Sequence, residues 1–537
     1  MIKLDDIRRH AANRPEQIAV VDGASRLTWG QFADHVDRMA AGLSAQLPPT
    51  RPARAVHLAD NRWELAVAMA ACATLGVSCT GLDVEAGAEE LTGLLARIQP
   101  TVVFVSTEHR QVLDGCVWPT GPEALHVLLD GAEAGATARP AGVGSRSVSF
   151  GALLATEPLP NLPIPLPYES LTVVPGEGGS PRVAVRRSAV EGRHLVDLVD
   201  EFGFDGSDVH LTAAPLAQPT ARGLARTFLS LGGTLVLGPH RDPAALAALI
   251  VEERVTTAVI DPVALVRLLS HPGSEALAGS AQLRCVIALG RHLNRWVVNT
   301  AWEQLGPVLH LAYATPETGL NAIMGPDELH VAPIRSGRMM LGSSLAILDQ
   351  DGAPLPAGAT GRVAISGYQV MDGYLEGEAE FTTLDLGQGP QRFFVTGERG
   401  QLDEQGRLVV TSRGTEVPTV SRNGAVDTEI FRLEADLLNL PCLRDTAVMR
   451  VDVPGLGDSL VVPFIAVAVG RELTGYKTLT AACNRRIPSL PAHVIAVDHI
   501  PYSPTGTINT DELLDSVLPI IKLNLQLEHT MQQEMSA

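Results

Sequence analysis

Short apolar runs alternate with longer stretches rich in alanine and leucine through most of the chain. The short runs are rich in β-branched residues and have the length of buried strands; they lie at 56–58, 102–105, 234–237, 258–260 and 285–288. The longer stretches have a helical composition and lie at 65–76, 243–251 and 262–269. Strands that alternate with helices in this way are typical of parallel sheets covered by helices. The pattern predicts an α/β fold with mainly parallel sheets.

The chain is long enough for several cores. Its 537 residues correspond to roughly three or four domain-sized units. Five prolines between 158 and 167 predict a connector between two of these units. We place domain boundaries after Arg413 and Ser516: residues 1–413 form a large domain, 414–516 a small α+β domain that begins with a mobile stretch at 414–420, and 517–537 a tail. Apolar residues alternate with period two at 521–527, which favours a strand there.

Composition narrows the possible environments and partners. The chain is 45% hydrophobic and 19% charged, as expected of a globular protein, and its net charge of −19 argues against a nucleic-acid partner. No uncharged apolar run approaches the roughly 20 residues that span a bilayer, and no apolar leader opens the chain. The six cysteines have no CxxC spacing, which argues against a zinc site and favours a reducing compartment. We expect a cytoplasmic protein without a membrane partner.

A short motif near the C-terminus points to a chemistry. Pro504-Thr505-Gly506 is followed by Thr507 and then by an acidic amphipathic stretch at 511–515. This resembles the terminal motif of the superfamily of acyl-CoA synthetases, adenylation domains and luciferases, in which a lysine follows the proline-threonine-glycine turn. In that family the lysine contacts the carboxylate and the α-phosphate as the acyl-adenylate forms. Because Thr507 replaces it, the resemblance leaves no certain catalytic residue in this chain.

The resemblance continues in order along most of the chain. It includes 14–30, the helix at 61–76, the small twisted sheet at 337–374, the Thr396-Gly397-Glu398 motif, and Arg413 at the end of the large domain. It implies an acyl-CoA synthetase-like fold. Such a fold has a large N-terminal domain of mainly parallel sheets flanked by helices, a small β-rich subdomain, and a small mobile α+β C-terminal domain.

The segment at 174–183 resembles the family's phosphate loop but departs from it. Gly176, Gly179 and Pro181 match, Arg182 replaces a lysine, and the four hydroxyl positions hold Val174, Pro175, Glu177 and Gly178. A carboxylate about 4 Å from a phosphate charge costs roughly 4 kcal/mol at an effective dielectric near 20. We therefore predict that Glu177 opposes a bound triphosphate. The arginines Arg182, Arg186 and Arg187 either supply charge to another phosphate or are solvated surface residues.

The positions that bind acyl-adenylate in the family are better preserved. The resemblance implies that Gly290 and Arg291 lie along adenine and that the segment Ala312, Tyr313, Ala314 supplies a stacking ring. It also implies that Glu317 stands at the magnesium glutamate, that Glu398 replaces the aspartate that binds the ribose, and that Arg413 contacts ribose and phosphate. Pro316 replaces the threonine that touches the α-phosphate. The alternatives are that Tyr313 is ordinary core and that Glu398 and Arg413 form a surface ion pair.

Two further segments correspond to the acceptor and acyl sites of the family. The resemblance places Asn423 and Gly424 at the pantetheine tunnel of coenzyme A. It places Gln218 and Gly223, in the segment 215–223, at the acyl pocket. This segment lacks the aspartate that holds the α-amine in amino-acid-activating domains, and its surroundings are rich in Ala, Leu and Gly. We therefore expect a bulky apolar carboxylic acid rather than an amino acid.

The departures from the family's motifs affect its two half-reactions differently. Adenylation needs triphosphate, magnesium and the lysine, whereas thiolysis needs a bound acyl-AMP and a thiol. The leading hypothesis is a non-adenylating acyl-CoA ligase homologue, resembling those of platensimycin-type antibiotic pathways. It would take acyl-AMP from a partner adenylating enzyme and transfer the acyl group to coenzyme A, releasing AMP without a metal. The alternatives are a non-catalytic acyl-adenylate-binding or scaffold homologue and a full ATP-dependent synthetase with atypical motifs. A carrier-protein thiol as acceptor and a homodimer both stay open.

Overall fold

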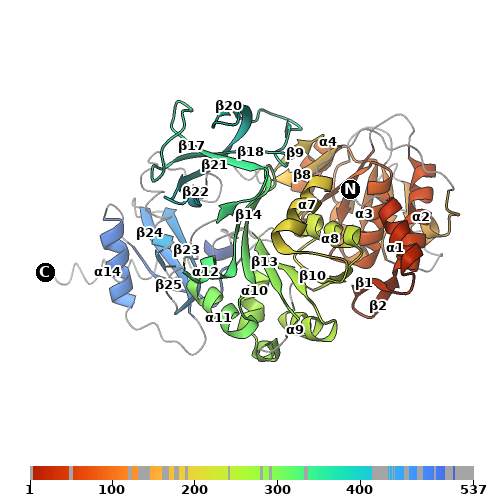
Figure 1. Ribbon diagram of the computed structural model, residues 1–537, viewed down its shortest axis with the longest axis horizontal. Helices are drawn as coiled ribbons and strands as arrows, with labels where there is room; N and C mark the ends of the chain where they lie inside the picture. The colour runs from red at the N-terminus through yellow and green to blue at the C-terminus, as the bar shows by residue number, and fades with distance from the viewer. Residues whose placement is uncertain are drawn as a thin grey trace.

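The structure is a computed structural model, and it describes most of the chain (Figure 1). The described residues are 4–47, 53–118, 124–130, 146–159, 169–174, 181–187, 191–239, 242–277, 282–289, 293–331, 337–413, 433–434, 436–437, 440, 442–452, 459–467, 476–488, 492–501 and 512–514. Residues 160–167 of the expected connector at 158–167, the stretch at 414–420 and the strand at 521–527 lie outside these ranges.

The largest sheet has nine strands in the order β16-β15-β14-β13-β12-β10-β11-β1-β2. Its centre, from β14 to β1, is parallel, and β2, β15 and β16 are antiparallel to their neighbours. Its strands are β1 (Ile18–Asp22), β2 (Ser25–Thr28), β10 (Val209–Ala213), β11 (Thr234–Leu237), β12 (Thr257–Ile260), β13 (Cys285–Leu289), β14 (Leu309–Thr315), β15 (Gly319–Met324) and β16 (Arg338–Met339).

A second sheet is parallel throughout, in the order β4-β3-β5-β6-β7. It comprises β3 (Arg54–Leu58), β4 (Ser78–Gly81), β5 (Val102–Val105), β6 (Leu125–Leu128) and β7 (Arg146–Ser149). Beside it lies a small antiparallel sheet of β8 (Ser170–Val174), β9 (Arg182–Arg186) and β19 (Gly373–Tyr374). All five strand runs expected from the sequence are confirmed, because short β-branched segments that are buried on both faces can form only central strands.

Helices connect and cover the parallel strands. They are α1 (Leu4–Asn13), α2 (Trp29–Gln46), α3 (Trp63–Thr74), α4 (Ala88–Ile98), α5 (Arg110–Asp114), α6 (Phe150–Leu154), α7 (Glu191–Phe202), α8 (Pro219–Leu231), α9 (Pro243–Glu252), α10 (Pro262–Ser270), α11 (Arg295–Leu305) and α12 (Pro326–Val331), with 3₁₀ turns η1 (Thr107–His109) and η3 (Pro272–Leu277). The starts of α9 and α10 are fixed by the caps Asp242 and Asp261, each followed by a proline. Helix α3 is buried over most of its surface, which explains its alanine-rich sequence.

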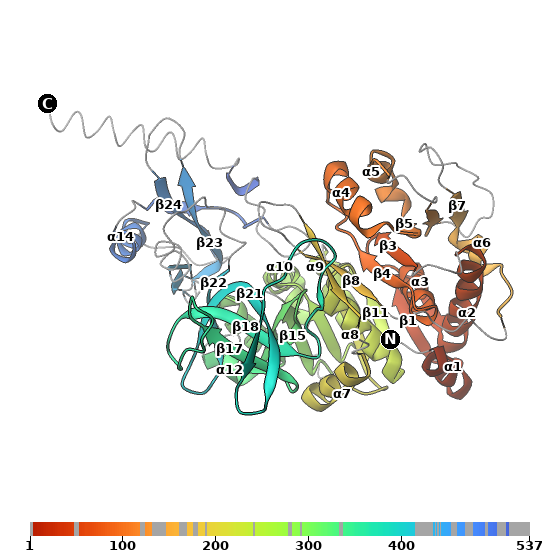
Figure 2. The ribbon, with the colours of Figure 1, turned by 90° about the horizontal axis from the view of Figure 1, so that it is seen from above.

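Two smaller β units complete the described part of the chain. The five-stranded antiparallel unit has β17 (Ser343–Leu348), β18 (Gly361–Gly367), β20 (Phe381–Asp385), β21 (Pro390–Leu402) and β22 (Leu408–Arg413). The C-terminal unit has β23 (Leu443–Asp452), β24 (Ser459–Val467), β25 (Ile495–Ala496) and helix α14 (Tyr476–Arg486). Both views show these units toward the end of the molecule opposite α1 and α2 (Figures 1 and 2). The expected fold class is thus confirmed.

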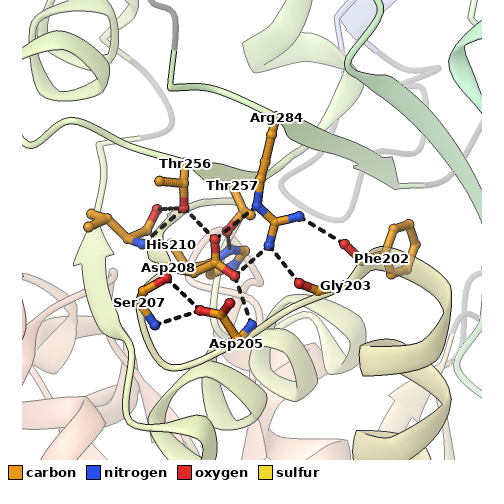
Figure 3. Close-up of polar contacts among 10 residues, drawn as sticks. Phe202, Gly203, Asp205, Ser207, Asp208, His210, Thr256, Thr257 and Arg284 are labelled. Carbon is orange, nitrogen blue, oxygen red and sulfur yellow. Dashed lines mark hydrogen bonds and ion pairs between the residues drawn. The ribbon is translucent and has the colours of Figure 1, made fainter.

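An ion pair between a buried aspartate and a partly exposed arginine ties together the amino-terminal edge of the nine-stranded sheet (Figure 3). Asp208, just before β10, accepts from Arg284 Nη2 at 2.6 Å and from Thr256 Oγ1 at 2.7 Å. Arg284, just before β13, also donates to the carbonyls of Phe202 and Gly203. Because three strands begin at these residues, the cluster fixes their relative register. It lies at the edge opposite the carboxyl ends of the strands, where open α/β sheets bind ligands.

No helix in the described part of the chain is long and apolar enough to cross a bilayer.

Candidate functional site

The candidate residues gather at the carboxyl ends of parallel strands in the nine-stranded sheet. Strands β10, β12, β13 and β14 are consecutive neighbours in that sheet and run in one direction. Gln218 follows β10, Gly290 follows β13 directly, and Tyr313 lies near the end of β14. Ligands of open parallel sheets bind at this edge. The topology therefore brings the sequence-predicted adenylate and acyl segments to one side of the sheet.

A tight turn joins β14 to β15 and carries two of the candidate residues. Thr318 N–H donates to the Thr315 carbonyl at 3.3 Å and to the Thr315 hydroxyl at 3.2 Å. Pro316 occupies the second position of this turn, which its fixed φ suits. The next residue, Glu317, is held from outside, because Met371 N–H donates to its carbonyl at 2.7 Å. The proline thus preserves the turn while it removes the hydroxyl that the family uses.

Tyr313 is buried and contacts the β-rich subdomain. Its exposed fraction is 1%, and its ring packs in a cluster with Ile365, Leu408 and other apolar residues. Its hydroxyl donates a hydrogen bond to Glu398 Oε2. This arrangement agrees with the core alternative for Tyr313. Stacking of the ring on adenine stays a prediction.

Glu398 lies on β21, where it joins the nine-stranded sheet to the β-rich subdomain. Its side chain is half-buried and accepts from Tyr313, which lies 85 positions earlier in the chain. Thr396 fixes the local backbone, since its hydroxyl accepts from Glu398 N–H at 3.2 Å and donates to the Val363 carbonyl at 3.0 Å. Across the ladder, Glu398 is in register with Arg413 on β22. The two residues implied to bind ribose are therefore cross-strand neighbours.

The Glu317 carboxylate is held by a tyrosine that the sequence comparison did not single out. Tyr374 on β19 donates from its hydroxyl to Glu317 Oε1 at 3.3 Å. Burial raises the pKa of Glu317, and the nearby charge of Glu398 raises it further. The hydrogen bonds to its carboxylate lower the pKa but do not outweigh burial. Burial also raises the pKa of Tyr374, so its hydroxyl stays a proton donor. The Gly373-Tyr374 motif was the available signal for this residue, but sequence alone did not indicate its partner.

Arg182, at the lysine position of the phosphate loop, lies against the same tyrosine. Its guanidinium carbon is 3.4 Å from the centroid of the Tyr374 ring, and its Nη2 donates to the Glu378 carbonyl at 2.6 Å. Strand pairing explains the contact, because Tyr374 is in register with Ala184, two residues along β9 from Arg182. Arg182 is therefore partly buried against the Tyr374 ring, and a role of its guanidinium toward a phosphate stays a prediction. Arg182, Tyr374 and Glu317 form one stack, which we call the tyrosine stack.

The predicted acyl segment forms a well-supported loop between β10 and α8. Asn61 Nδ2 donates to the Ala214 carbonyl at 2.9 Å, and Asn61 Oδ1 accepts from Leu216 N–H at 2.8 Å. Gln218 is the residue before α8 and donates its N–H to the Pro215 carbonyl at 2.9 Å. Gly223 lies in the first turns of α8, and a Cβ there would meet no atom within 4 Å. The loop is therefore rigid, and open space adjoins Gly223.

Several predicted site residues lie outside the described part of the chain. They are Gly176, Glu177, Gly178, Gly179, Gly290, Arg291, Asn423, Gly424 and Thr507. The side chain of Arg413 is likewise outside it. Their roles stay predictions.

The family's magnesium requirement can be tested on Glu317. A magnesium ligand needs an ionised carboxylate with an accessible oxygen. Here burial disfavours the charged form, Tyr374 donates to one oxygen, and the adjacent residue is Pro316 instead of a threonine. The expected absence of a metal at this site stays a prediction.

Comparisons with known proteins identify the family and support the fold. The sequence pattern of the family described as AMP-binding enzyme matches residues 7–157 and 186–375. An indoleacetate–CoA ligase of Aromatoleum aromaticum is 26% identical over 514 residues, covering 94% of this chain and 96% of its own. A 2-hydroxy-7-methoxy-5-methyl-1-naphthoate–CoA ligase of Streptomyces carzinostaticus is 24% identical, covering 93% and 90%. The structure of an anthranilate CoA ligase in complex with anthranoyl-AMP is similar in fold, with a TM-score of 0.76 at 17% identity and 96% coverage of both chains. The chain belongs to the AMP-binding enzyme family and has its acyl-CoA synthetase-like fold.

Proposed function

We propose that this enzyme transfers the acyl group of a preformed acyl-AMP to coenzyme A and does not make the acyl-AMP itself. The thiolate of coenzyme A attacks the acyl carbonyl, the bond from that carbonyl carbon to the AMP oxygen breaks, and AMP leaves. The thiol proton passes to solvent. A partner adenylating enzyme supplies the acyl-AMP. The reaction needs no triphosphate and no divalent cation.

The tyrosine stack is the observation that carries this proposal. In the family, the residue at position 182 is a lysine that holds phosphates, and Glu317 corresponds to the residue that holds magnesium. Here one tyrosine ring contacts Arg182 and its hydroxyl binds Glu317. Both groups already have a partner in Tyr374, with which ATP and magnesium would have to compete. A cation over a tyrosine ring contributes about 0.5–2 kcal/mol, which ATP binding would have to offset.

Sequence departures support the same conclusion. Thr507 replaces the catalytic lysine, and Glu177 stands where the family has a hydroxyl. The match to the family pattern is also interrupted between residues 157 and 186, the interval that contains the altered phosphate loop. Losing one preorganised donor costs about 100- to 1000-fold in rate. We expect several such losses together to lower adenylation below detection.

Thiolysis makes smaller demands on the protein. An acyl-AMP is already activated, and a thiol with a pKa near 8.5 is a good nucleophile once ionised. Orienting the two reactants supplies up to about 7–11 kcal/mol of the barrier. The carboxyl edge of β10, β13 and β14 offers the surface on which acyl-AMP would be oriented. The retained residues thus suit this half-reaction.

The acyl group is a bulky apolar acid in this proposal. The printed names of the relatives include aromatic acids, such as indoleacetate and a substituted naphthoate. The segment after β10 has no acidic residue for an α-amine, and space adjoins Gly223. The resemblance to non-adenylating ligases of platensimycin-type pathways suggests natural-product biosynthesis. An aromatic or polycyclic carboxylic acid is the substrate class that fits these observations.

A binding role without catalysis is the second candidate function. The observation in its favour is the burial of Tyr313, because a ring that is only 1% exposed is not available for stacking in this conformation. Production of acyl-CoA separates the two candidates.

Two assays on the purified protein test the proposal. In the first, synthetic acyl-adenylates of aromatic acids and coenzyme A are supplied, and acyl-CoA and AMP are measured. In the second, acid-dependent exchange of pyrophosphate into ATP is measured with magnesium across the same acids. We expect acyl-CoA formation that is unaffected by a chelator, and no exchange. Exchange at a rate ordinary for a ligase refutes the loss of adenylation, whereas absence of both activities favours the binding role.

Tyr374→Phe is the matched variant for these assays. It keeps the ring that Arg182 contacts and removes the hydroxyl that binds Glu317. We expect its thiolysis rate to stay within about threefold of the parent. A large loss of thiolysis together with a folded protein contradicts the assignment of the tyrosine stack to the lost half-reaction.

A further inference from the structure

The five-stranded parallel sheet has a topological switch point between β3 and β5. Its strands lie in the order β4-β3-β5-β6-β7, so the chain leaves β3 toward β4 on one side and then crosses to β5 on the other. The carboxyl ends of β3 and β5 are therefore neighbours. In open parallel sheets with this strand order, ligands bind in the crevice outside these two ends. The residues that follow β3 and β5 are thus candidates for a ligand site separate from the nine-stranded sheet.

Three potential metal ligands lie at this switch point. Asp60 follows the end of β3, and Glu108 and His109 lie in the turn after β5. His109 Nε2 is 3.3 Å from Asp60 Oδ2 and 3.9 Å from Glu108 Oε1. The three ligand atoms lie within 4.8 Å of one another, and among the described residues no other group of this kind occurs. The imidazole distinguishes the group from an ordinary acidic patch.

The spacing of these atoms is close to that of a zinc site. Two ligand atoms at about 2.1 Å from a tetrahedral zinc ion lie roughly 3.4 Å apart. The distance from His109 Nε2 to Asp60 Oδ2 matches this value, and the Glu108 oxygen has to approach the imidazole by about 0.5 Å. The Glu108 side chain is 57% exposed, so a change of rotamer can supply this movement.

Neighbouring residues orient the ligands. Ser106 is fully buried at the end of β5, and its hydroxyl donates to Glu108 Oε1 at 2.9 Å. Hydrogen bonds of this kind orient the ligands of metal sites, and a carboxylate oxygen keeps a second lone pair for the ion. The N–H of Thr107 donates to Asp130, which also pairs with Arg62. The charge of Arg62 is thus matched by a carboxylate outside the three ligands.

We propose that Asp60, Glu108 and His109 bind a divalent transition-metal ion, with zinc preferred. An imidazole beside carboxylates suits zinc, whereas magnesium prefers oxygen ligands and keeps several of its waters. Three protein ligands leave the fourth position of a tetrahedral zinc ion for water. Cysteine spacing could not indicate this site, because its ligands are two carboxylates and an imidazole.

The ion would join the ends of two neighbouring strands and take no part in acyl transfer. Asn61, next to Asp60, holds the loop between β10 and α8 through the Ala214 carbonyl and the Leu216 N–H. These bonds involve the Asn61 side chain alone, so the loop is held whether or not an ion is bound. Zinc binding therefore does not depend on which half-reaction the enzyme performs.

Calorimetric titration of the untagged full-length protein, first treated with a chelator that is then removed, tests the site. We expect one zinc ion per chain, with manganese bound more weakly and magnesium most weakly. Asp60→Ala and His109→Gln should each weaken zinc binding at least about tenfold, since losing even an orienting partner of a ligand costs about 10- to 100-fold. X-ray absorption of the zinc-loaded protein should show nitrogen and oxygen neighbours at about 2.0–2.2 Å.

His35→Gln is the matched control. The His35 imidazole lies 3.8 Å from the Asp34 carboxylate but belongs to no group of three potential ligands in the described part of the chain. Its loss should leave zinc affinity unchanged. Glu108→Gln is the further ligand variant, because a change at an exposed side chain is least disruptive to folding, and it too should weaken zinc at least about tenfold.

Three outcomes would overturn the assignment. They are a parent protein that binds no zinc at a one-to-one ratio, folded variants of Glu108 and His109 that keep the parent's zinc affinity, and sulfur neighbours at about 2.3 Å in the absorption spectrum. The last result would mean that cysteines hold the ion instead. Circular dichroism establishes which variants are folded.

Discussion

Removing the carboxylate of Glu398 separates a ribose-binding role from a structural one. If Glu398 binds the ribose, it makes charge-assisted hydrogen bonds worth about 1.5–3 kcal/mol each. Loss of even one such bond weakens binding about tenfold, because about 1.4 kcal/mol is a factor of ten. We therefore expect Glu398→Ala to bind an acyl-sulfamoyl-adenosine analogue at least about tenfold more weakly than the parent protein.

The contact with Tyr313 adds a second expected effect. In Glu398→Ala the buried Tyr313 hydroxyl loses its hydrogen bond to a carboxylate, and such a bond to a charged group contributes about 1.5–3 kcal/mol. The variant should therefore also unfold at lower denaturant concentration. Glu398→Gln retains an acceptor for Tyr313 but not the charge, so its stability should recover more than its affinity.

Calorimetry measures the affinity of each protein for the analogue and for ATP, and urea unfolding measures its stability. Glu380→Ala is the control, because Glu380 is an exposed carboxylate of the same subdomain that pairs with Arg362. It should leave affinity unchanged. A Glu398→Ala protein that is destabilised but binds the analogue normally refutes the ribose role and leaves Glu398 as a structural partner of Tyr313. Equal affinity of the parent for ATP and the analogue refutes selectivity for acyl-AMP.

Three other expected outcomes concern repair, stability and pH. Thr507→Lys alone should restore little pyrophosphate exchange, because Glu177 still opposes the triphosphate; robust exchange would disprove that role of Glu177. Asp208→Asn should lower the free energy of unfolding by about 1–3 kcal/mol, since it removes the charge that buried Asp208 presents to the partly exposed Arg284, whereas exposed Asp351→Asn should change little in the same urea titration. Burial lowers the pKa of His57 and His210 to about 3, so these neutral rings take up protons on unfolding below their usual pKa of 6.5. Stability should fall by up to ~1.4 kcal/mol per pH unit for each ring as pH drops from about 6.5 toward 3. Urea titrations of His210→Gln at several pH values should show a free energy of unfolding that depends less steeply on pH than that of the parent protein. An unchanged dependence on pH would contradict this reasoning.

Local sequence determined the strands and several helix starts. The β-branched runs at 102–105 and 258–260 became strands with every residue buried, because such short apolar segments satisfy their backbone only inside a sheet. Capping aspartates followed by proline began α9 and α10. The order of motifs along the chain also placed Tyr313 and Gln218 at strand ends, since the carboxyl ends of neighbouring parallel strands share one edge.

Tertiary structure alone decided what these residues contact. Neither the bond from Tyr313 to Glu398 nor the position of Arg182 on Tyr374 has a local signal, because the partners are far apart in sequence and meet through strand register. The same holds for Arg284 and Asp208. Composition and spacing report which residues are available, whereas the pairing of strands sets which side chains face one another. The departures from the family could be read from the sequence, whereas the contacts of Tyr374 with Arg182 and Glu317 required the folded chain.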